Sequence, residues 1–487
     1  MRSTKFSLVL MLVGAALAPA ACGESDTGGP GSSGKGGTSS GGGNGGKGGT
    51  AGSTSGAAGT TDAAGTAGDA GAAGQAGGGD AGNAGAAGAT GDAGLHLYVG
   101  CSVPEGTLQT YRVSDGTITA LPVTNTMGSI SNATFNQAQD RLYVAHAVGT
   151  GPAGRVTTYS RNLSSGALTQ VGTSAEVPFT TPSFGSAGGG GTGGSGGTGG
   201  SGGAGGGSGT GGNAGSAGAP ATNPLPQTLT LDANENHIAI PNYGSGNVYV
   251  YGLQADGSLG AIVSADAGGM NAHHAVFSNN QNFMLVPYLG SNQIKVYAYQ
   301  KSSGGITLDS TVALPNASSG PRHLALHSNG TWLYAINETA GGAASAAGSL
   351  DFLSFDQSNG DLTPTHSYPV PLPNGYTGLK NGSEIEIAPS GKFLYVSMRL
   401  DNVAQGSLVV FAIGVDGGLS FVEQQSSRGV TPRQFSLSSD GKLLAVGNQN
   451  SATLELFSVD TESGALTFVA EQAVCVSPRF TRFAEIR

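Results

Sequence analysis

A unit of short alternating strands recurs along this chain about every 50 residues, and this repeat constrains the fold more than any other feature. The clearest copy runs from GPRHLALHSNG (320–330) through WLYAINE (332–338) and SLDFLSF (349–355) to Leu362. Apolar and polar residues alternate in each segment, and Asn-Gly, Ser-Gly or Asp-Gly pairs mark the turns, as is typical of antiparallel hairpins. Four strands per repeat predict one blade each of an all-β propeller. Other copies place an apolar pair at the matching strand: Leu142-Tyr143, Ile238-Ala239, Met284-Leu285, Leu394-Tyr395 and Leu444-Ala445.

The two ends of the repeat region each carry part of one blade. LHLYVG (95–100) has the pattern of a second strand, whereas SPRFTRF (477–483) matches the first strand that begins at Gly320. Joining them gives seven blades, with a closing blade shared by the N- and C-terminal strands, and leaves no open sheet edge in the ring. An open β-sandwich would leave this match unexplained. The prediction is therefore a seven-bladed β-propeller over residues 94–487.

Glycine, with 88 residues in a chain of 487, is concentrated in two tracts. Residues 23–93 are almost entirely Gly, Ala, Ser, Thr, Asp and Asn, and they cannot bury enough apolar surface to offset chain entropy. We predict a disordered linker there, acting as a flexible tether. The second tract, 185–221, is predicted to be a disordered insertion in the propeller, which is tolerable because closure entropy grows only logarithmically with loop length.

The first 22 residues have the features of an export signal. An apolar core (6–18) follows two basic residues, and small residues lead to Cys22. The residues around Cys22 are similar to the end of a bacterial lipobox, in which the cysteine is lipidated, whereas Ala18-Pro19-Ala20 would suit ordinary signal peptidase. We favour a lipoprotein anchored through Cys22. Both routes predict an exported domain, on the periplasmic or cell-surface side of a membrane.

Charge limits the partners that can be expected. The chain carries 20 Lys+Arg against 30 Asp+Glu, a formal net charge of −10. This balance lacks the basic surface that phosphate backbones require, so nucleic acid is not an expected partner. No stretch after the export signal is apolar and long enough to span a bilayer, so membrane contact is expected only through the N-terminal anchor. We expect a monomer.

Two cysteines, Cys101 and Cys475, lie beyond the export signal. Both fall in the predicted closing blade, so an exported chain could join them in a disulfide. Each also stands in an apolar, strand-like context, where a buried free thiol is the alternative. We favour the free thiols.

Two repeat positions hold residue types that packing does not require. The first lies at the start of the innermost strand and holds, in blade order, Arg479, Ser131, Gln227, His273, Arg322, Ser383 and Arg433. The second follows the apolar second strand and holds Ser102, Ala147, Tyr243, Leu289, Glu338, Arg399 and Gln449. First strands line the channel of a propeller, so both rings are expected to surround its mouth. Ser131, Ser102 and Gln227 are interpreted as solvated rim residues.

Blades four to seven concentrate the charged members of these rings, so their side chains are expected to converge. Arginines in a concave mouth suit a carboxylate or phosphate ligand, because the guanidinium fork binds oxygens bidentately. His273 is the only ring member with an ordinary pKa near neutrality, which makes it the candidate for proton transfer. The residues predicted to bind substrate are Arg433, Gln449, Tyr243 and Glu384. The second ring has one carboxylate among arginines and would repel a cation, so we expect no metal and no other cofactor.

These same segments carry a family resemblance that covers nearly all of 95–487. The chain resembles the lactonase (6-phosphogluconolactonase-like) propellers and is similar to the carboxymuconate-lactonizing enzymes. The matching segments are GPRHLALHSNGTWLYAINE (320–338), GSEIEIAPSGKFLYVSMR (382–399), TPRQFSLSSDGKLLAVGNQNS (431–451), PNYGSGNVYVYGLQADGSLG (241–260), VFSNNQNFMLVPYLGS (276–291) and VCVSPRF (474–480).

The resemblance implies a metal-free site made of one histidine, two arginines and a glutamate, which fall on His273, Arg322, Arg399 and Glu338. His273 would act as general base on water. The two arginines would bind the anionic group of the substrate and stabilise the oxyanion, and Glu338 would orient an arginine or carry a proton. The chain departs from the family at Asn271, where a second histidine is frequent, at Thr228, and at His146-Ala147, which replaces Asn-Glu.

The leading hypothesis is therefore a lactone hydrolase that acts on a sugar or small anionic lactone outside the cytoplasm. A Gly-x-Ser-x-Gly nucleophile elbow in a strand-to-helix context is absent from the sequence, which leaves a serine-esterase mechanism unsupported. The alternative is a non-catalytic propeller on a tether that binds a protein or glycan at the cell surface. An enzyme requires the four core residues within reach of one small ligand, whereas a scaffold does not.

Overall fold

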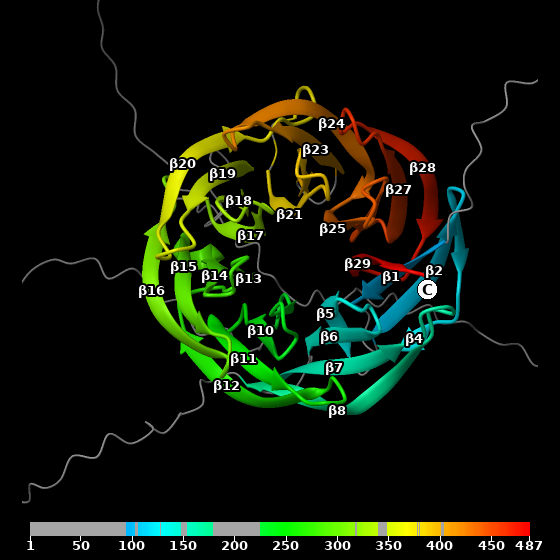
Figure 1. Ribbon diagram of the computed structural model, residues 1–487. Coiled ribbons are helices and arrows are strands. Elements are labelled where there is room, and N and C mark those ends of the chain that lie inside the picture. Colours follow the sequence, from blue (N-terminus) through cyan, green and yellow to red (C-terminus); the bar gives the residue numbers. More distant parts are fainter. Residues whose placement is uncertain are drawn as a thin grey trace, which may run out of the picture. The chain divides into compact units, whose positions relative to one another are not determined.

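The computed structural model describes residues 94–102, 106–126, 128–147, 153–178, 225–316, 319–338, 348–376, 378, 380–400 and 404–487. Over these residues the chain forms seven antiparallel sheets around a central channel, as Figure 1 shows. The predicted all-β, seven-bladed propeller is confirmed. The export signal (1–22) with Cys22, the linker (23–93) and the insertion (185–221) lie outside the described residues and stay predictions. Within the described ranges, no helix has the length and apolar character needed to cross a membrane.

The first blade is built from strands far apart in the sequence. Its order is β29 (Pro478–Glu485), β1 (Leu95–Cys101), β2 (Thr107–Ser114) and β3 (Thr117–Ala120), and β4 (Thr124–Asn125) also pairs with β2. Innermost β29 runs antiparallel to β1, with Leu95 opposite Glu485. In Figure 1 the red C-terminal strand lies beside the blue N-terminal one. The predicted shared closing blade is confirmed.

The other six blades each contain four strands in sequence order, with the first strand innermost. Blade two consists of β5 (Ser129–Phe135), β6 (Arg141–Ala147), β7 (Ala153–Arg161) and β8 (Leu168–Pro178). Blade three consists of β9 (Thr230–Leu231), β10 (His237–Pro241), β11 (Asn247–Leu253) and β12 (Leu259–Ala267). Blade four consists of β13 (Val276–Phe277), β14 (Phe283–Tyr288), β15 (Gln293–Gln300) and β16 (Gly305–Ala313), with a short 3₁₀ turn, η1 (Leu289–Ser291), after β14.

Blades five to seven complete the ring. Blade five consists of β17 (Pro321–Leu326), β18 (Trp332–Asn337), β19 (Ser349–Phe355) and β20 (Leu362–Pro369). Blade six consists of β21 (Gly382–Ile387), β22 (Phe393–Met398), β23 (Gln405–Ile413) and β24 (Leu419–Val430). Blade seven consists of β25 (Pro432–Leu437), β26 (Leu443–Asn448), β27 (Thr453–Val459) and β28 (Leu466–Ala473).

Neighbouring blades pack through the apolar side chains that alternate along their strands. Leu97 and Val99 of β1 share a buried cluster with Leu454 and Leu456 of β27, so apolar contact also joins the last blade to the first. Second-strand tyrosines add a polar contact between blades, since a buried hydroxyl needs a partner. The hydroxyls of Tyr98, Tyr334 and Tyr395 donate to the carbonyl oxygens of Gly166, Gly417 and Gly464 in the next blade.

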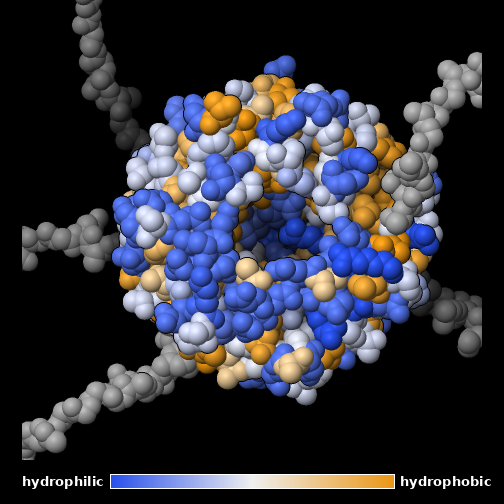
Figure 2. All heavy atoms as spheres, viewed as in Figure 1, coloured by the Kyte–Doolittle hydropathy of each residue, from blue (hydrophilic) through white to orange (hydrophobic). Residues whose placement is uncertain are grey.

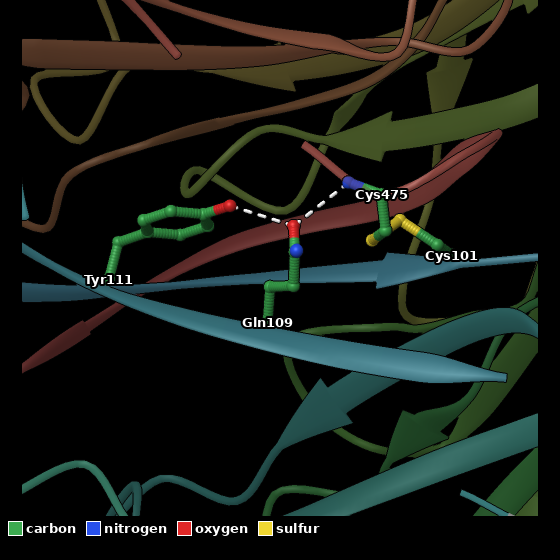
Figure 3. Close-up of a disulfide and its surroundings, with 4 residues drawn as sticks. All are labelled: Cys101, Gln109, Tyr111 and Cys475. Carbon is green, nitrogen blue, oxygen red and sulfur yellow. Dashed lines mark hydrogen bonds between the residues drawn. A yellow bond between two sulfur atoms is a disulfide. The ribbon is translucent and has the colours of Figure 1, made fainter. Parts of the chain in front are cut away.

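A disulfide between Cys101 and Cys475 ties the closing blade together, with Cα atoms 5.9 Å apart and a sequence separation of 374 residues. The free-thiol interpretation was therefore wrong. Figure 3 shows how the segment before β29 is held against β2: the backbone N–H of Cys475 donates to Oε1 of Gln109 (2.9 Å), which also accepts from the Tyr111 hydroxyl (2.7 Å). An apolar local sequence suggests burial of a thiol, but the pairing depends on ring closure.

Candidate active site

A one-residue irregularity interrupts the innermost strand near its start in five blades. In β17, Pro321 pairs with Asn337 and His323 with Ile336, so Arg322 is the extra residue of a bulge. The same kind of register shift occurs around Ser131, Ser383, Arg433 and Arg479. A bulge re-aims side chains and breaks the strict alternation of a strand. Consecutive residues therefore line the channel: Ser131 with Asn132, Arg322 with His323, and Arg433 with Gln434.

The first ring lies inside the channel, not at its mouth. All seven members are at most 9% exposed: Arg479, Ser131, Gln227, His273, Arg322, Ser383 and Arg433. The interpretation of Ser131 and Gln227 as solvated rim residues was therefore wrong. The Ser131 hydroxyl donates to the carbonyl oxygen of Pro226 (2.5 Å), and Oε1 of Gln227 accepts from Arg433 (3.5 Å). Buried polar groups usually have hydrogen-bond partners, as these two residues do.

Glu338 joins the two predicted catalytic arginines. It follows β18, and its carboxylate lies 3.0 Å from Nε of Arg322 and 2.5 Å from an NH2 nitrogen of Arg399, which follows β22 of the next blade. The Glu338 side chain is 18% exposed, against 2% for Arg322 and 8% for Arg399. The bridge therefore runs from the buried channel toward solvent, and three of the four core candidates are in direct contact.

The guanidinium of Arg322 is held on more than one side. Its NH1 donates to the carbonyl oxygen of Ser383 (2.7 Å) and approaches Nε2 of His323 (3.2 Å), while Nε faces Glu338. A planar guanidinium with contacts along two edges cannot rotate freely. Arg322 is therefore a pre-positioned cation in the channel.

His273, the fourth core candidate, lies in the same part of the channel. Its ring is 4.9 Å from that of His323 and meets the Tyr243 ring edge-on at 5.7 Å. Burial, followed by the charges of Arg322, Arg433 and Arg399, lowers the pKa of His273 well below its ordinary value, so the imidazole is neutral at physiological pH. Neither ring nitrogen has a hydrogen-bond partner among the described residues. A neutral, unpartnered imidazole can accept a proton.

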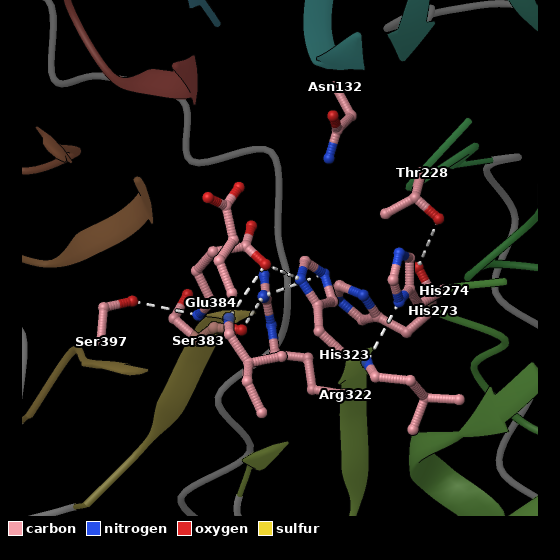
Figure 4. Close-up of polar contacts among 12 residues, drawn as sticks. Asn132, Thr228, His273, His274, Arg322, His323, Ser383, Glu384 and Ser397 are labelled. Carbon is pink, nitrogen blue, oxygen red and sulfur yellow. Dashed lines mark hydrogen bonds and ion pairs between the residues drawn. The ribbon is translucent and has the colours of Figure 1, made fainter. Parts of the chain in front are cut away.

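A small polar cavity of about 10 Å³ adjoins these groups, which is the size needed for a single water molecule. It is lined by Ser131, Asn132, Gln227, His273, Arg322, His323, Glu384, Arg433, Gln434 and Arg479. Figure 4 shows Asn132 across the channel from His273, Arg322 and His323. The space-filling view in Figure 2 shows a central hollow in one face of the ring, lined by hydrophilic residues.

The four residues predicted to bind substrate occupy different depths. Tyr243 and Gln449 are half-buried, whereas Arg433 and Glu384 are 3% and 5% exposed. Arg433 reaches the small cavity, and Glu384 binds His323 (2.7 Å). Tyr243 and Gln449 are therefore more accessible to solvent than Arg433 and Glu384.

His323 was missed by the sequence argument, as was its bond to Glu384. In a regular strand His323 would point away from the channel if Arg322 points into it. The bulge at Arg322 removes that alternation and brings both side chains to the channel. The pair Arg-His within GPRHLAL was the available signal, because a histidine beside an arginine at an inner strand start is not required for packing.

Among the described residues there is no group of three or more His, Cys, Asp or Glu that could hold a metal ion. A larger cavity of about 540 Å³ lies toward the other end of the inner strands, where Phe135, Leu326, His274 and Arg482 contribute to its walls. It contains none of the four core candidates. The described chemistry is thus gathered at the end of the channel where the inner strands begin.

Comparisons with known proteins support the fold and the family. A family model described as "Lactonase, 7-bladed beta-propeller" matches residues 212–483. A 6-phosphogluconolactonase of Bacillus subtilis (strain 168) is 28% identical over 272 residues, which are 53% of this chain and 73% of the relative. One from Sodalis glossinidius is 27% identical over 254 residues, 52% of this chain and 73% of the relative.

Among solved structures, the periplasmic gluconolactonase of Pseudomonas aeruginosa superposes with a TM-score of 0.63 at 25% identity. The superposition covers 81% of this chain and 100% of the gluconolactonase. The likeness thus extends over the whole ring and is not limited to a few blades.

Proposed function

Since the chain belongs to the family of seven-bladed β-propeller lactonases, we propose that it hydrolyses a sugar lactone or another small anionic lactone, without a metal ion and outside the cytoplasm. The observation that carries this proposal is the site itself. A neutral histidine, whose two ring nitrogens have no partner in the described part of the chain, adjoins a cavity the size of one water molecule, and Arg322 lines the same cavity.

In the proposed reaction His273 removes a proton from a water molecule, whose oxygen attacks the carbonyl carbon of the lactone. The carbonyl oxygen becomes an oxyanion, which Arg322 and Arg399 stabilise. The ring C–O ester bond then breaks, and the proton held by His273 passes to the departing alkoxide. The product is a hydroxy acid, and all atoms of water and lactone are accounted for.

The positive surroundings of His273 make it a weak base in the resting protein, because its pKa is lowered by burial and by three arginines. An anionic transition state offsets the charge of those arginines and so raises the pKa of His273 while the reaction proceeds. Proton transfer is therefore favoured when the oxyanion forms. This coupling between the developing negative charge and the pKa of His273 favours hydrolysis of a lactone. Binding of a neutral sugar develops no negative charge and would not use it.

The size of the inner cavity decides where the lactone binds. Ligand pockets usually measure about 300–1,000 Å³, so a cavity of about 10 Å³ admits water but not a lactone ring. We place the lactone at the mouth, against Tyr243, Glu338, Arg399 and Gln449, with its carbonyl toward Arg322. Arg433 acts from within the channel through its charge.

Three independent observations support export. The N-terminal 22 residues have the composition of an export signal, a relative of the same fold is described as periplasmic, and Cys101–Cys475 is a disulfide. Disulfides persist in oxidising compartments. Anchoring through a lipid on Cys22, and a monomeric state, are further parts of this proposal.

The test is a hydrolysis assay of the full chain with gluconolactone, 6-phosphogluconolactone and a series of neutral and acidic lactones, following acid release at constant pH. We expect turnover, with acidic lactones favoured by kcat/KM because of the arginines at the site. A protein that hydrolyses none of them above the background rate contradicts the proposal. That result favours the tethered, non-catalytic binding module instead.

A further inference from the structure

A buried glutamate–histidine pair is linked to the arginine–glutamate bridge. Glu384 of β21 and His323 of β17 are 5% and 4% exposed and come from neighbouring blades. Nδ1 of His323 lies 2.7 Å from Oε1 of Glu384, and the same oxygen accepts the backbone N–H of Ile385 at 3.0 Å. Figure 4 shows these side chains grouped with Arg322. No step of the proposed reaction uses the pair.

Two contacts assign one tautomer to His323. Burial raises the pKa of the Glu384 carboxyl group, but its Oε1 already accepts the backbone N–H of Ile385 and so faces His323 as an acceptor; Nδ1 therefore carries the proton. Nε2 lies 3.2 Å from NH1 of Arg322, and a guanidinium only donates, so Nε2 is the acceptor. The imidazole is therefore neutral. Burial, and then the charges of Arg322, Arg433, Arg399 and Arg482, lowers its pKa well below the ordinary value.

The ring of His323 cannot easily turn away from this arrangement. It packs against the rings of His273 and His274, each 4.9 Å away. Nδ1 of His274 accepts the backbone N–H of Leu324 (3.1 Å), and burial lowers the pKa of His274 to about 3, so it is neutral as well. The groups in contact with His323 are thus Arg322, Glu384 and two uncharged histidines, while Arg433, Arg399 and Arg482 act on it through their charges.

We infer that His323 and Glu384 are positioning residues for Arg322. Glu384 fixes His323 with its bare Nε2 toward Arg322, and this acceptor, with the carbonyl oxygen of Ser383, holds the guanidinium plane while Glu338 binds its Nε. A flipped or protonated imidazole would turn an N–H toward the guanidinium and displace it. The expected effect on catalysis rests on the proposed function. The contacts that hold Arg322 do not depend on it.

NMR of the full chain labelled with ¹⁵N-histidine tests the tautomer of His323. The chain has eight histidines. His146, whose Nδ1 donates to the carbonyl oxygen of Gly128 (3.4 Å), should give the signal of a protonated Nδ1 in every variant. We expect a second such signal from His323, with a bare Nε2, unchanged from pH 5 to pH 9 and missing from the His323→Phe variant. Glu384→Gln, whose amide oxygen can still accept, should retain this signal, and Glu384→Leu should lose it. A His323 that carries its proton on Nε2, or that titrates in this range, overturns the inference.

Kinetics test the positioning role. Per folded molecule, we expect His323→Phe and Glu384→Leu to lower kcat about 10- to 100-fold with a smaller change in KM, and Glu384→Gln to stay within about threefold of wild type. His366→Phe is the matched control, since His366 is an exposed histidine of β20 in the same blade and does not line the cavity; it should keep the wild-type kcat. Wild-type kcat in a folded Glu384→Leu variant overturns the inference. A wild-type protein that hydrolyses no lactone refutes the proposed function instead. In that case the NMR spectra alone test the arrangement of His323 and Glu384.

Discussion

Single charged residues hold the candidate site together, and Glu338 is the clearest case. It is the only carboxylate among the described residues in contact with both Arg322 and Arg399, and it is partly open to solvent. Hydrogen-bonded ion pairs of this kind matter less for stability than for the placement of each partner. The geometry of the two arginines thus depends on one side chain.

Glu338→Gln should therefore lower kcat/KM for lactone hydrolysis about 100-fold, because the neutral amide cannot hold two guanidinium groups in register. Steady-state kinetics on the preferred lactone measure the effect. Glu176→Gln, which removes an exposed Arg–Glu pair on blade two, is the control and should match wild type. A Glu338→Gln enzyme within threefold of wild type would show that the bridge has no catalytic role.

A buried acid in blade seven, Glu455, makes the stability of the fold depend on pH. Glu455 is fully buried, with Oε1 3.4 Å from Nδ2 of Asn448 and Oε2 without a partner among the described residues. Burial raises the pKa of Glu455 to about 7. The folded state then holds a proton that the unfolded state releases near pH 4.5, so the contribution to stability is present below pH 4.5 and is lost as pH rises to about 7.

Thermal melts of wild type and Glu455→Gln between pH 5 and pH 8 test whether stability falls as pH rises because of Glu455. The free energy of unfolding should fall less in the variant than in wild type as the pH rises from 5 to 8. The difference between the two falls should reach roughly 2 kcal/mol at pH 8. Burial also raises the pKa of Glu386 to about 7, so wild type and variant should both retain some decline from that residue. Parallel melting curves for the two proteins would contradict the assignment to Glu455.

The irregular elements separate what the sequence could predict from what it could not. Period-2 alternation and turn pairs were enough to place most strands, because those signals are local. The bulges at Arg322 and Arg433 are not local signals, since they appear only in the pairing of β17 with β18 and β25 with β26. His323 was missed for that reason, and the first ring was placed too close to solvent.

The disulfide of the closing blade is the other element that local sequence did not decide. Cross-linking residues 374 apart restricts the unfolded chain strongly. Reduction, or Cys475→Ser, should lower stability by about 2–5 kcal/mol and lower the Tm by several degrees. Differential scanning calorimetry with and without reductant measures this. The Cys101→Ser/Cys475→Ser double variant is the control and should not respond to reductant; an equal response in both proteins would contradict the prediction.

On the scale of the whole molecule, the sequence predicted the ring because repetition and the match between its two ends are global patterns. The alignment of the repeats also places the site at one end of the channel, because each inner strand begins at that end. The four core candidates came from the family resemblance. The structure connects Arg322, Glu338 and Arg399 directly and places His273 beside the cavity that Arg322 lines.

The proposed anchor is tested on the mature chain. Expressed in a bacterium with lipoprotein-processing enzymes, it should begin at Cys22, carry a lipid on that residue and sediment with membranes. Cys22→Ala should instead be released in soluble form or remain unprocessed. Mass spectrometry of the N-terminal peptide decides, and an unmodified cysteine would contradict the lipoprotein assignment.

The most direct test of the central claim compares wild type with His273→Ala and Arg322→Ala on the lactone that wild type prefers. We predict that both variants stay folded, as measured by circular dichroism, and lose at least about 100-fold in kcat. Hydrolysis by both variants at the wild-type rate would show that the channel residues do not catalyse the reaction.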